Sequence, residues 1–498
     1  MLHSLFFENA KLHGWRNALN VSGTIYSYAE LASAALNVSR YLQSAGAEPG
    51  TRICIFAPKD FWGYSAVLGV LHAGCTYIPL EPTYPTPRLQ MILERAAPKF
   101  FLIPNDIPNG LSAPENCKIV RREDFDDPAK YDLSGIKDQA TDASALAYIL
   151  FTSGSTGVPK GVKITHANAQ AFVNWGLQYF SVTPDDIMSG HSDLTFDLSV
   201  FDVFVALSAG ASLVPVLDMM DRASPGMFIK SNAISIWFSV PSIMTSMSAL
   251  EQVSAEFLSG LRFMAFCGEP LRPSVVSMLR QACPDLKIAN LYGPTEATVA
   301  CSAYEIEMPL DASKDGVPIG WKTEGTGIFV WHSEGRVAQI GETGEVYIYG
   351  DQVGPGYFRN EEATNKRFRD DPRGVSGKCF VTGDLAIVGR LGPVFIARKD
   401  SQIKHRGYRI ELGDVEHAMA SLPGVIECVA GLIPDGKGGE KFMGFIRHHD
   451  KEIRPSVVMK GMNKIVPSYM VPTRIKMVDD FPRTANNKID RKRLSELS

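Results

Sequence analysis

The sequence lacks the features of membrane, zinc-binding and disulfide-rich proteins. No apolar run approaches the roughly 18 residues that a membrane-spanning helix needs. The first fifteen residues, MLHSLFFENAKLHGW, do not have the form of a signal peptide. The eight cysteines occur singly, without a CxxC pair, which excludes the common zinc spacings and favours reduced thiols. We therefore expect a cytoplasmic protein without a membrane span.

An excess of charge of either sign is also missing. The 498 residues carry a formal net charge of −4, and 21% of them are charged, so the composition argues against a general nucleic-acid-binding protein. Apolar residues make up 45% of the chain, which is typical of globular proteins. Because a chain of this length exceeds one hydrophobic core, we expect a large multi-lobed domain and a smaller one.

The apolar runs predict an α/β fold with parallel sheets. Strand-like and helix-like segments alternate, as in βαβ units, over residues 52–57, 61–72, 76–80, 87–96 and 99–104. Three later runs of strand length, AISIWFSVPS, LRFMAFCGEP and KIANLYGPTE, end in Gly, Pro or polar residues. Ligands in open α/β sheets bind beyond the carboxyl ends of the strands, so these endings are candidate walls of a site.

The character of the sequence changes near residue 400. The stretch ARKDSQIKHRGYRIELGDVE is densely charged. The segments after it predict a helix, two strands and a helix over residues 411–420, 426–433, 441–447 and 456–465. We expect a large N-terminal domain of several sheets, residues 1–399, and a small α+β domain, residues 400–498, joined through Asp400.

The stretch FTSGSTGVPKGV, residues 151–162, predicts a phosphate-binding loop that is not a P-loop. A P-loop requires GxxxxGK[ST] before a helix, whereas Lys160 follows a proline and residues 162–164 alternate like a strand. Backbone N–H groups, four hydroxyls and the Lys160 ammonium are suited to wrapping a polyphosphate. The alternative is a flexible turn.

Eight stretches, taken in order, resemble the adenylate-forming superfamily and specifically its amino-acid adenylation enzymes. They are YILFTSGSTGVPKGV, FDLSVFD (196–202), FCGEPL (266–271), NLYGPTEATVA (290–300), GEVYIYG (344–350), FVTGDLA (380–386), RKDSQIKHRGYRIELGDVE (398–416) and TANNKIDRKRL (484–494). The resemblance is strongest to stand-alone ligases of the D-alanine–carrier protein type, related to nonribosomal peptide synthetase adenylation domains. Ala397 and Asn487 stand where the family usually has glycine.

This resemblance implies a reaction in two halves. An amino-acid carboxylate attacks the α-phosphorus of ATP, with Mg²⁺ on the phosphates, to give an aminoacyl adenylate and pyrophosphate. The thiol of a phosphopantetheine arm then takes the aminoacyl group. No carrier segment follows Ser498, so we expect the carrier to be a separate protein. The alternative within the superfamily is an acyl- or aryl-CoA synthetase; a non-catalytic binding protein with the same fold is the other alternative.

The resemblance also implies roles for particular residues. Glu296 would bind Mg²⁺, Tyr292 would lie against the adenine, and Asp384 would bind the ribose beside Arg398. Lys488 would be catalytic, contacting the substrate carboxylate and the phosphate. The full nucleotide-binding set is Thr152, Ser153, Gly154, Ser155, Thr156, Gly157, Lys160, Gly268, Glu269, Asn290, Leu291, Tyr292, Gly293, Pro294, Thr295, Asp384, Arg398 and Lys488. The plainer alternatives are a capped strand end for Glu296, a turn for Asp384 and a solvated tail for Lys488.

Asp197 indicates the class of substrate. It stands among apolar residues with no Lys or Arg beside it, so a substrate ammonium would balance its charge; a helix cap is the alternative. The family's pocket positions correspond to Asp197, Leu198, Phe201, Ile243, Ala265, Cys267, Leu291, Val299 and Ala300. Apart from Asp197 none is charged, which favours a small neutral amino acid, alanine first, with proline or serine as alternatives.

Family behaviour further implies a mobile small domain that rotates between the two half-reactions. Asp400 would be the hinge, unless it merely ends a strand. During transfer, residues 402–411 would face the cleft, and Gly407 would allow close approach of the phosphopantetheine arm.

Overall fold

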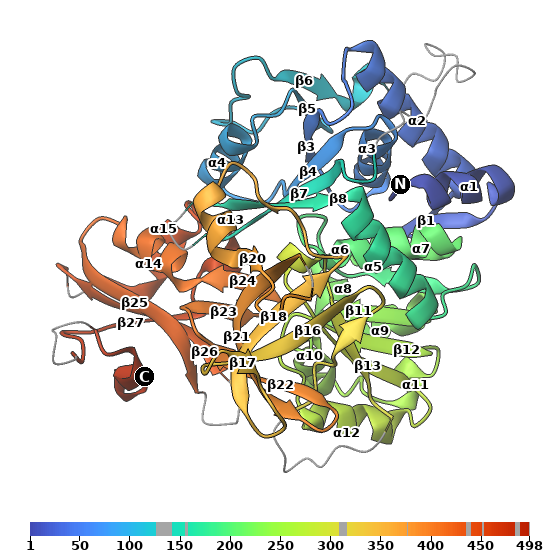
Figure 1. The fold of residues 1–498 in the computed structure, drawn as a ribbon. Coiled ribbons are helices and arrows are strands. Elements are labelled where there is room, and N and C mark those ends of the chain that lie inside the picture. Colours follow the sequence, from blue (N-terminus) through green and yellow to red (C-terminus); the bar gives the residue numbers. More distant parts are fainter. Residues whose placement is uncertain are drawn as a thin grey trace.

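The computed structural model describes residues 1–125, 142–154, 158–307, 316–375, 377–434, 440–450, 453–483 and 489–497. They form a large N-terminal part with three multi-stranded sheets and a smaller C-terminal part (Figure 1). This confirms the predicted α/β class with a large multi-sheet domain and a small α+β domain. The division at residue 400 stays a prediction.

One seven-stranded sheet contains the first βαβ units. In spatial order its strands are β19 (Gly356–Tyr357), β8 (Lys160–Thr165), β7 (Leu146–Thr152), β4 (Thr76–Leu80), β3 (Arg52–Phe56), β5 (Phe100–Ile103) and β6 (Lys118–Arg121). Strand β3 pairs in parallel with β4 and β5, and the connecting helices are α3 (Phe61–His72) and α4 (Thr86–Ala96). These elements begin and end within one residue of the predicted ones.

The predicted phosphate loop joins two antiparallel strands of this sheet. Strands β7 and β8 pair from Leu146–Thr165 to Thr152–Lys160. The prediction of a strand–loop–strand element is therefore confirmed. Gly154 lies two residues beyond the end of β7. A Cβ there would fall 2.1 Å from the carbonyl oxygen of Val158, which explains the glycine at this position.

The eight-stranded sheet carries the three predicted strand ends. Its spatial order is β14 (Ser302–Glu305), β13 (Lys287–Tyr292), β12 (Phe263–Phe266), β11 (Ile236–Ser239), β9 (Ile187–Gly190), β10 (Ser212–Pro215), β1 (Asn17–Val21) and β2 (Thr24–Ser27). Strands β11, β12 and β13 are parallel neighbours, so their carboxyl ends lie together at one edge, as expected from the three apolar runs.

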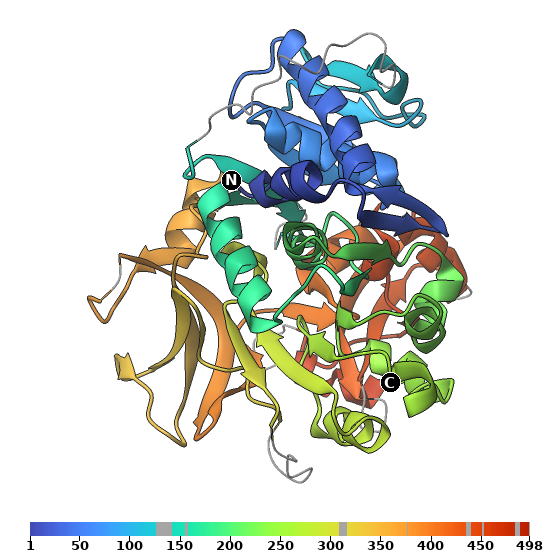
Figure 2. The same cartoon turned by 90° about the vertical axis from the view of Figure 1, so that its right-hand side faces the viewer.

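The third sheet is antiparallel and follows the second in sequence. Its path is β15 (Lys322–Thr323), β16 (Thr326–His332), β18 (Thr343–Gly350), β21 (Lys378–Gly389) and β20 (Phe368–Asp370), with β17 (Arg336–Val337) on β16 and β22 (Gly392–Arg398) on β21. In the side view the blue strands lie above, and the mostly green sheet and the yellow-to-orange sheet lie below (Figure 2).

Helices cover the sheets of the large part. They are α1 (Ser4–His13), α2 (Tyr28–Ser44), α5 (His166–Tyr179), α6 (Leu198–Val200), α7 (Ala206–Ala209), α8 (Met219–Ala223), α9 (Pro225–Ser231), α10 (Ile243–Ala249), α11 (Ala255–Leu258), α12 (Pro273–Ala282) and α13 (Glu361–Arg367). A π-helical turn, Phe201–Val205, joins α6 to α7. Among the described residues, no helix combines the length and apolar character needed to cross a bilayer.

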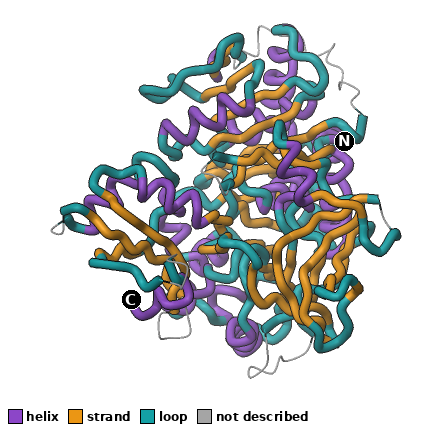
Figure 3. Tube along the Cα trace, turned by 60° about the vertical axis from the view of Figure 1, so that its left-hand side comes forward, coloured by secondary structure: helices purple, strands orange, loops and turns teal. Residues whose placement is uncertain are grey.

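The C-terminal part begins with a two-stranded hairpin, β23 (Gln402–His405) and β24 (Tyr408–Glu411). It continues through α14 (Leu412–Ala420), β25 (Val425–Pro434), β26 (Glu440–His448), α15 (Pro455–Met462) and β27 (Arg474–Met477). This part has a buried core of its own, including Ile410, Met419 and Phe442. Figure 3 shows its strands and helices beside the larger body.

The turn of the β23–β24 hairpin explains the glycine in its sequence. His405 pairs with Tyr408, so Arg406 and Gly407 form a two-residue turn. Both have positive φ, 52° and 80°, as a type I′ turn requires. The turn extends the hairpin toward the large part.

Candidate active site

The candidate site is a cavity of about 80 Å³ between the two parts of the protein. It lies at the carboxyl ends of β12 and β13, beside the end of β7. Lys404, Gly407 and Arg409 from the C-terminal hairpin also line it. The predicted residues that line this cavity are Thr152, Ser153, Asp197, Leu198, Cys267, Gly268, Gly293, Pro294, Thr295, Asp384 and Arg398.

Two smaller groups of predicted residues line neighbouring cavities. One cavity, of about 50 Å³, is lined by Gly268, Glu269, Asn290, Leu291 and Tyr292. The other, of about 160 Å³, is lined by Thr152, Ser153, Lys160, Glu296 and Asp400. Residues that the sequence placed in separate motifs thus lie around adjoining cavities, while their individual roles stay predictions.

Asp197 is a buried carboxylate with no ion pair among the described residues. It is 9% exposed and precedes α6 without a side-chain capping hydrogen bond, unlike the helix-cap alternative. Burial raises the pKa of Asp197 to about 6, although a hydrogen bond with Thr295 opposes the shift. A cationic ligand group would therefore be favoured at this end of the cavity.

A chain of charged contacts connects Tyr292, at the cavity of about 50 Å³, with residue 400. The Tyr292 hydroxyl donates to Asp384 Oδ2 at 2.6 Å, and Arg398 Nη1 donates to Asp384 Oδ1 at 2.5 Å. Arg398 also binds both carboxylate oxygens of Asp400, at 2.7 and 2.9 Å. Asp384 is 2% exposed, so this predicted ribose-binding carboxylate is already held in place by its neighbours.

The carboxylate of Asp400 lies between two arginines. Arg367 Nη2, at the end of α13, donates to Asp400 Oδ2 at 2.8 Å, the same oxygen that accepts from Arg398 Nη2. Burial alone would raise the pKa of Asp400, but Arg398 and Arg367 outweigh it and hold the pKa at about 2. Its carboxylate therefore stays ionised in this arrangement, paired with both arginines.

The C-terminal hairpin faces the cleft in this structure, while its role in the transfer step stays a prediction. The Gly407 N–H donates to Glu269 Oε1 at 2.7 Å, and Arg409 Nη1 donates to Glu296 Oε2 at 2.6 Å. The hydroxyl of Ser153 donates to the Arg409 carbonyl at 2.8 Å. These contacts bring the C-terminal part onto the predicted phosphate loop and the predicted metal ligand.

Several residues at this site were missed by the sequence analysis. Arg409 and Asp414 lie in a motif that we quoted, and their charge was a usable signal. The Tyr357 hydroxyl donates to Glu296 Oε1 at 2.6 Å, but Tyr357 lies outside the motifs. Lys366 and Arg367 line the cavity beside Glu296, and α13, which carries them, has no motif of its own.

An aromatic wall was also missed, although Phe196 and Tyr408 lie in quoted motifs, because the motifs do not show that these rings meet. Tyr408 stacks on Tyr469 with ring centroids 4.1 Å apart, and Phe196 lies edge-on to Tyr408 at 4.7 Å. Tyr84 completes the group, 6.1 Å from Tyr469. Tyr84, Phe196 and Tyr469 line the central cavity, and they come from three distant stretches of the chain.

The remaining predicted pocket residues are buried around the site. Phe201 packs against Phe180 and Phe238, with ring centroids 4.8 and 4.6 Å apart. The others that are buried without lining the central cavity are Ile243, Ala265, Val299 and Ala300. Ser155, Thr156, Gly157 and Lys488 lie outside the described residues.

A single carboxylate, Glu296, is the predicted magnesium ligand. Among the residues that the structure describes, no group of three His, Cys, Asp or Glu side chains is arranged for metal binding. Magnesium bound with nucleotides usually takes one or two carboxylates and the phosphates, so one carboxylate is enough in principle. However, Tyr357 and Arg409 bind the two oxygens of Glu296. Mg²⁺ therefore does not fit at Glu296 while the hairpin is in this position.

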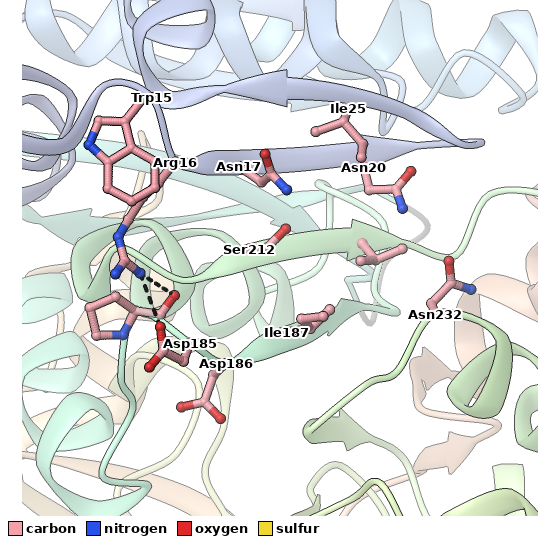
Figure 4. Close-up of a pocket in the computed structure, with 12 residues that line it drawn as sticks. Trp15, Arg16, Asn17, Asn20, Ile25, Asp185, Asp186, Ile187, Ser212 and Asn232 are labelled. Carbon is pink, nitrogen blue, oxygen red and sulfur yellow. Dashed lines mark hydrogen bonds and ion pairs between the residues drawn. The ribbon is translucent and has the colours of Figure 1, made fainter.

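A second, more open cavity of about 510 Å³ lies at the amino ends of β9 and β10 (Figure 4). Its charged groups have partners: Arg16 bonds to Asp185 at 3.3 Å, and Asp186 bonds to Arg262 at 2.7 Å. It lies at the strand ends opposite the candidate site. Its described lining contains no histidine or cysteine, so we assign it no chemistry.

Comparison with family models gives matches over most of the chain. A model described as AMP-binding enzyme matches residues 6–358. A model described as AMP-binding enzyme C-terminal domain matches residues 414–488. Five of the eight quoted motifs lie within the first match. FVTGDLA (380–386) lies between the two matches, and the last two motifs overlap the second match only at residues 414–416 and 484–488.

The relatives include both long and short proteins. AMB antimetabolite synthetase AmbB of Pseudomonas aeruginosa is 32% identical over 497 residues, covering 99% of this chain and 39% of AmbB. This chain thus spans well under half of that relative. L-proline–[L-prolyl-carrier protein] ligase of Pseudomonas fluorescens is 32% identical over 462 residues, 90% of each protein.

A solved structure has the same fold. The Vibrio cholerae adenylation domain AlmE, in complex with glycyl-adenosine-5'-phosphate, aligns with a TM-score of 0.85 at 24% identity. The alignment covers 100% of this chain and 97% of the AlmE chain. The likeness concerns the arrangement of both the large and the small part.

We predict that Gly407→Ala displaces the hairpin from the cleft. A Cβ at residue 407 would lie 2.4 Å from Val240 Cγ1, and the φ of 80° disfavours a side chain. Trypsin cleavage after Lys404 and Arg406 should become at least about threefold faster, because a displaced hairpin opens more often.

Gly341→Ala is the matched control for this variant. Gly341 has a similar φ of 87°, and a Cβ added there would meet no atom within 4 Å, so the control carries the backbone strain without the crowding. Equal cleavage rates in the Gly407 variant and the unmodified protein would contradict the docking contact.

Proposed function

The chain belongs to the AMP-binding enzyme family, and we propose that it activates a small neutral amino acid with ATP and transfers it to a phosphopantetheine thiol. One observation carries the amino-acid part: Asp197 is a buried carboxylate without an ion pair among the described residues, and burial outweighs the effect of the nearby cations Lys404 and Arg409 on its pKa. An α-ammonium group would supply the missing charge. A fatty or aryl acid has no such group, which disfavours the acyl- or aryl-CoA synthetase alternative.

In the first half-reaction, the amino-acid carboxylate oxygen forms a bond to the α-phosphorus and pyrophosphate leaves with the electrons of the broken P–O bond. Bringing an anion to a polyanion requires positive charge and positioning rather than a covalent nucleophile. The cavity beside Glu296 offers Lys160, Lys366 and Arg367. Magnesium, when bound with ATP, supplies further neutralisation of the phosphates. We assign Lys488 to the reacting carboxylate and phosphate, by resemblance.

The nucleotide is proposed to lie along the charged chain already described. Tyr292 and Gly268 border the adenine-side cavity, and Asp384 accepts hydrogen bonds that ribose hydroxyls would share. Glu269 lines the same cavity. Because Asp384 is held by Tyr292 and Arg398, we propose that Asp384 and Arg398 position the ribose and take no part in the bonds that form or break.

The side-chain subsite favours a compact, uncharged substrate. Leu198 and Cys267 border Asp197 in the cavity, and Phe201 fills the space behind them with its aromatic neighbours. A charged substrate side chain would be buried without a partner. Alanine is our first candidate for the substrate. Proline is the second, supported by the similarity to a ligase named for L-proline, and serine is the third.

In the second half-reaction, the thiol sulfur bonds to the acyl carbon, AMP leaves, and the thiol proton is released. The stacked Tyr408 and Tyr469, with Phe196 and Tyr84, border the cavity on the side of the C-terminal part. Their apolar faces and hydroxyls suit the slender amide-containing arm of phosphopantetheine. The partner is thus proposed to be a carrier protein bearing this arm.

Exchange of labelled pyrophosphate into ATP, measured over a panel of amino acids, tests this function. We expect exchange that depends on a small neutral amino acid and on Mg²⁺. Exchange with fatty or aryl acids instead would overturn the amino-acid assignment, and the absence of exchange with every acid would favour the non-catalytic alternative.

We predict that the kcat/KM for the amino acid falls about tenfold per pH unit below about pH 6. The pKa of Asp197, raised to about 6 by burial, places its protonation there, and protonated Asp197 cannot pair with an ammonium. Asp197→Asn should lose this acid limb and roughly 2–4 kcal/mol of transition-state stabilisation.

Asp185→Asn is the control, since the Asp185 side chain is 89% exposed. An acid limb that persists unchanged in Asp197→Asn would assign it to another group and remove the main support for an amino-acid substrate.

We predict that Asp400→Pro preserves adenylate formation but slows transfer to the carrier by at least about tenfold. Proline fixes φ near −65° and so restricts rotation at the proposed hinge. Asp400→Asn is the control, because it removes the charge between Arg398 and Arg367 but leaves the backbone free. Parallel losses of both half-reactions in the proline variant would exclude a hinge at this residue.

A further inference from the structure

One short segment of the large part carries three of the residues that border the central cavity. It leaves the eight-stranded sheet at Gly190, the last residue of β9, and leads into α6. Thr195, Phe196 and Asp197 of this segment line the cavity. Asp197 makes no side-chain capping hydrogen bond to α6, so the path of the backbone before it helps to set its direction.

A buried lysine from another sheet holds the beginning of this segment. Lys59 follows β3 of the seven-stranded sheet and is 7% exposed. Its Nζ donates to the carbonyl oxygens of Gly190 and His191 at 3.3 and 2.9 Å. It also lies 3.5 Å from Asp193 Oδ1. The ammonium group thus contacts two backbone carbonyls and a carboxylate at the point where the segment leaves its sheet.

The carboxylate of Asp193 is bound a second time, by an arginine. Arg222 Nη2, on α8, donates to Asp193 Oδ1 at 2.6 Å, the same oxygen that Lys59 approaches. Burial alone would raise the pKa of Asp193, but Lys59 and Arg222 outweigh it and lower the pKa. The carbonyl of Asp193 accepts from the Phe196 N–H at 2.9 Å, which closes a turn directly before α6. The two cations therefore hold the residue on which this turn is built.

We propose that Lys59 and Arg222 are positioning residues for the amino-acid site, because the turn that they hold directs Asp197 at the substrate ammonium. The inference rests on the proposed function, which gives Asp197 that ligand. Neither cation belongs to the described lining of the central cavity, so both act through the turn and not by contact with the substrate.

The plainer alternative is that Lys59 only connects the two sheets. A purely structural connection would stabilise the whole large part, so its loss would impair the binding of ATP and of the amino acid alike. A positioning role concerns one segment, and its loss would raise KM for the amino acid while KM for ATP stays the same. The ratio of the two KM values therefore separates the alternatives.

Steady-state kinetics of amino-acid-dependent pyrophosphate exchange measures this ratio. KM for the amino acid should rise at least about tenfold in Lys59→Met, and about threefold in Arg222→Gln, while KM for ATP stays within about twofold. Arg222 is 39% exposed, so its variant tests the proposal even if Lys59→Met does not fold. Lys230→Met is the matched control, because Lys230 pairs with Glu256 at 2.9 Å with 47% of its side chain exposed. It should leave both KM values unchanged.

The charge of Lys59 provides a second readout. Burial lowers the pKa of Lys59 to about 8, although Asp193 and Asp202 oppose the shift, and Arg222 adds to it. Lys59 therefore loses its proton well below the ordinary lysine pKa of 10.5. Between these two values the unfolded chain binds the proton more strongly, so the contribution of Lys59 to stability rises with pH. A loss of activity in this range would not come from unfolding at Lys59.

Several other titratable groups lie around these ion pairs. Burial lowers the pKa of His191 to about 3 and raises the pKa of Tyr408 to about 12, so neither changes charge near pH 8. Burial also raises the pKa of Asp202 well above its usual value, which makes Asp202 the competitor for any titration seen there. The remaining groups are Asp60, Tyr64 and Glu81.

The pH profile of kcat/KM for the amino acid identifies the group. Above about pH 8 it should fall about tenfold per pH unit. Arg222→Gln should move this limb to higher pH, whereas Asp193→Asn and Asp202→Asn should move it to lower pH, because these side chains lower and raise the pKa of Lys59. Lys59→Met should keep only the limb of the substrate ammonium, which all variants share.

Three results would overturn the proposal. Equal increases of both KM values in Lys59→Met would assign Lys59 to the structural connection, and unchanged KM values in both variants would remove the positioning role. An alkaline limb that disappears in Asp202→Asn, instead of shifting, would assign the titration to Asp202. The proposed function fails separately, if no amino acid supports pyrophosphate exchange by the unmodified protein.

Discussion

Glu296 is a buried carboxylate in the cleft, and its charge has to be balanced by a cation. The arrangement of the surrounding residues depends on which cation does so. Here Arg409 supplies the cation from the C-terminal part, with Tyr357 on the other oxygen. The ion pair places the hairpin on the phosphate loop and brings Gly407 to Glu269. The position of the small part is thus connected to the electrostatics of one side chain, because an unpaired buried charge is costly.

A second set of charges extends from the nucleotide side to the junction of the two parts. Tyr292, Asp384, Arg398 and Asp400 form a continuous chain of hydrogen bonds. Arg367 reaches the same Asp400 from α13 and also lines the cavity beside Glu296. Arg398, from the proposed nucleotide site, and Arg367, from the cavity beside Glu296, therefore both contact Asp400, the proposed hinge. These shared contacts offer a physical route that couples ligand binding at either site to the hinge.

Local pattern predicted much of the fold, because strands 52–56 and 76–80 and helix 61–72 depend on short-range periodicity. The strand–loop–strand element and the parallel strands that end near the site were also predictable. The pairing of Arg409 with Glu296 spans 113 residues, and no spacing rule foresees it. The aromatic wall of Tyr84, Phe196 and Tyr469 and the burial of Phe201 likewise depend on tertiary packing, which motifs do not specify.

The most direct test of this account follows both half-reactions in one single-turnover experiment with Arg409→Gln. Adenylate formation should stay within about twofold of the unmodified enzyme, while transfer to the carrier thiol should fall at least about tenfold, since only the docked state loses its ion pair. Arg406→Gln should leave both rates unchanged. Equal losses in adenylate formation and transfer would contradict the claim that Arg409 serves Glu296 only when the small part is docked.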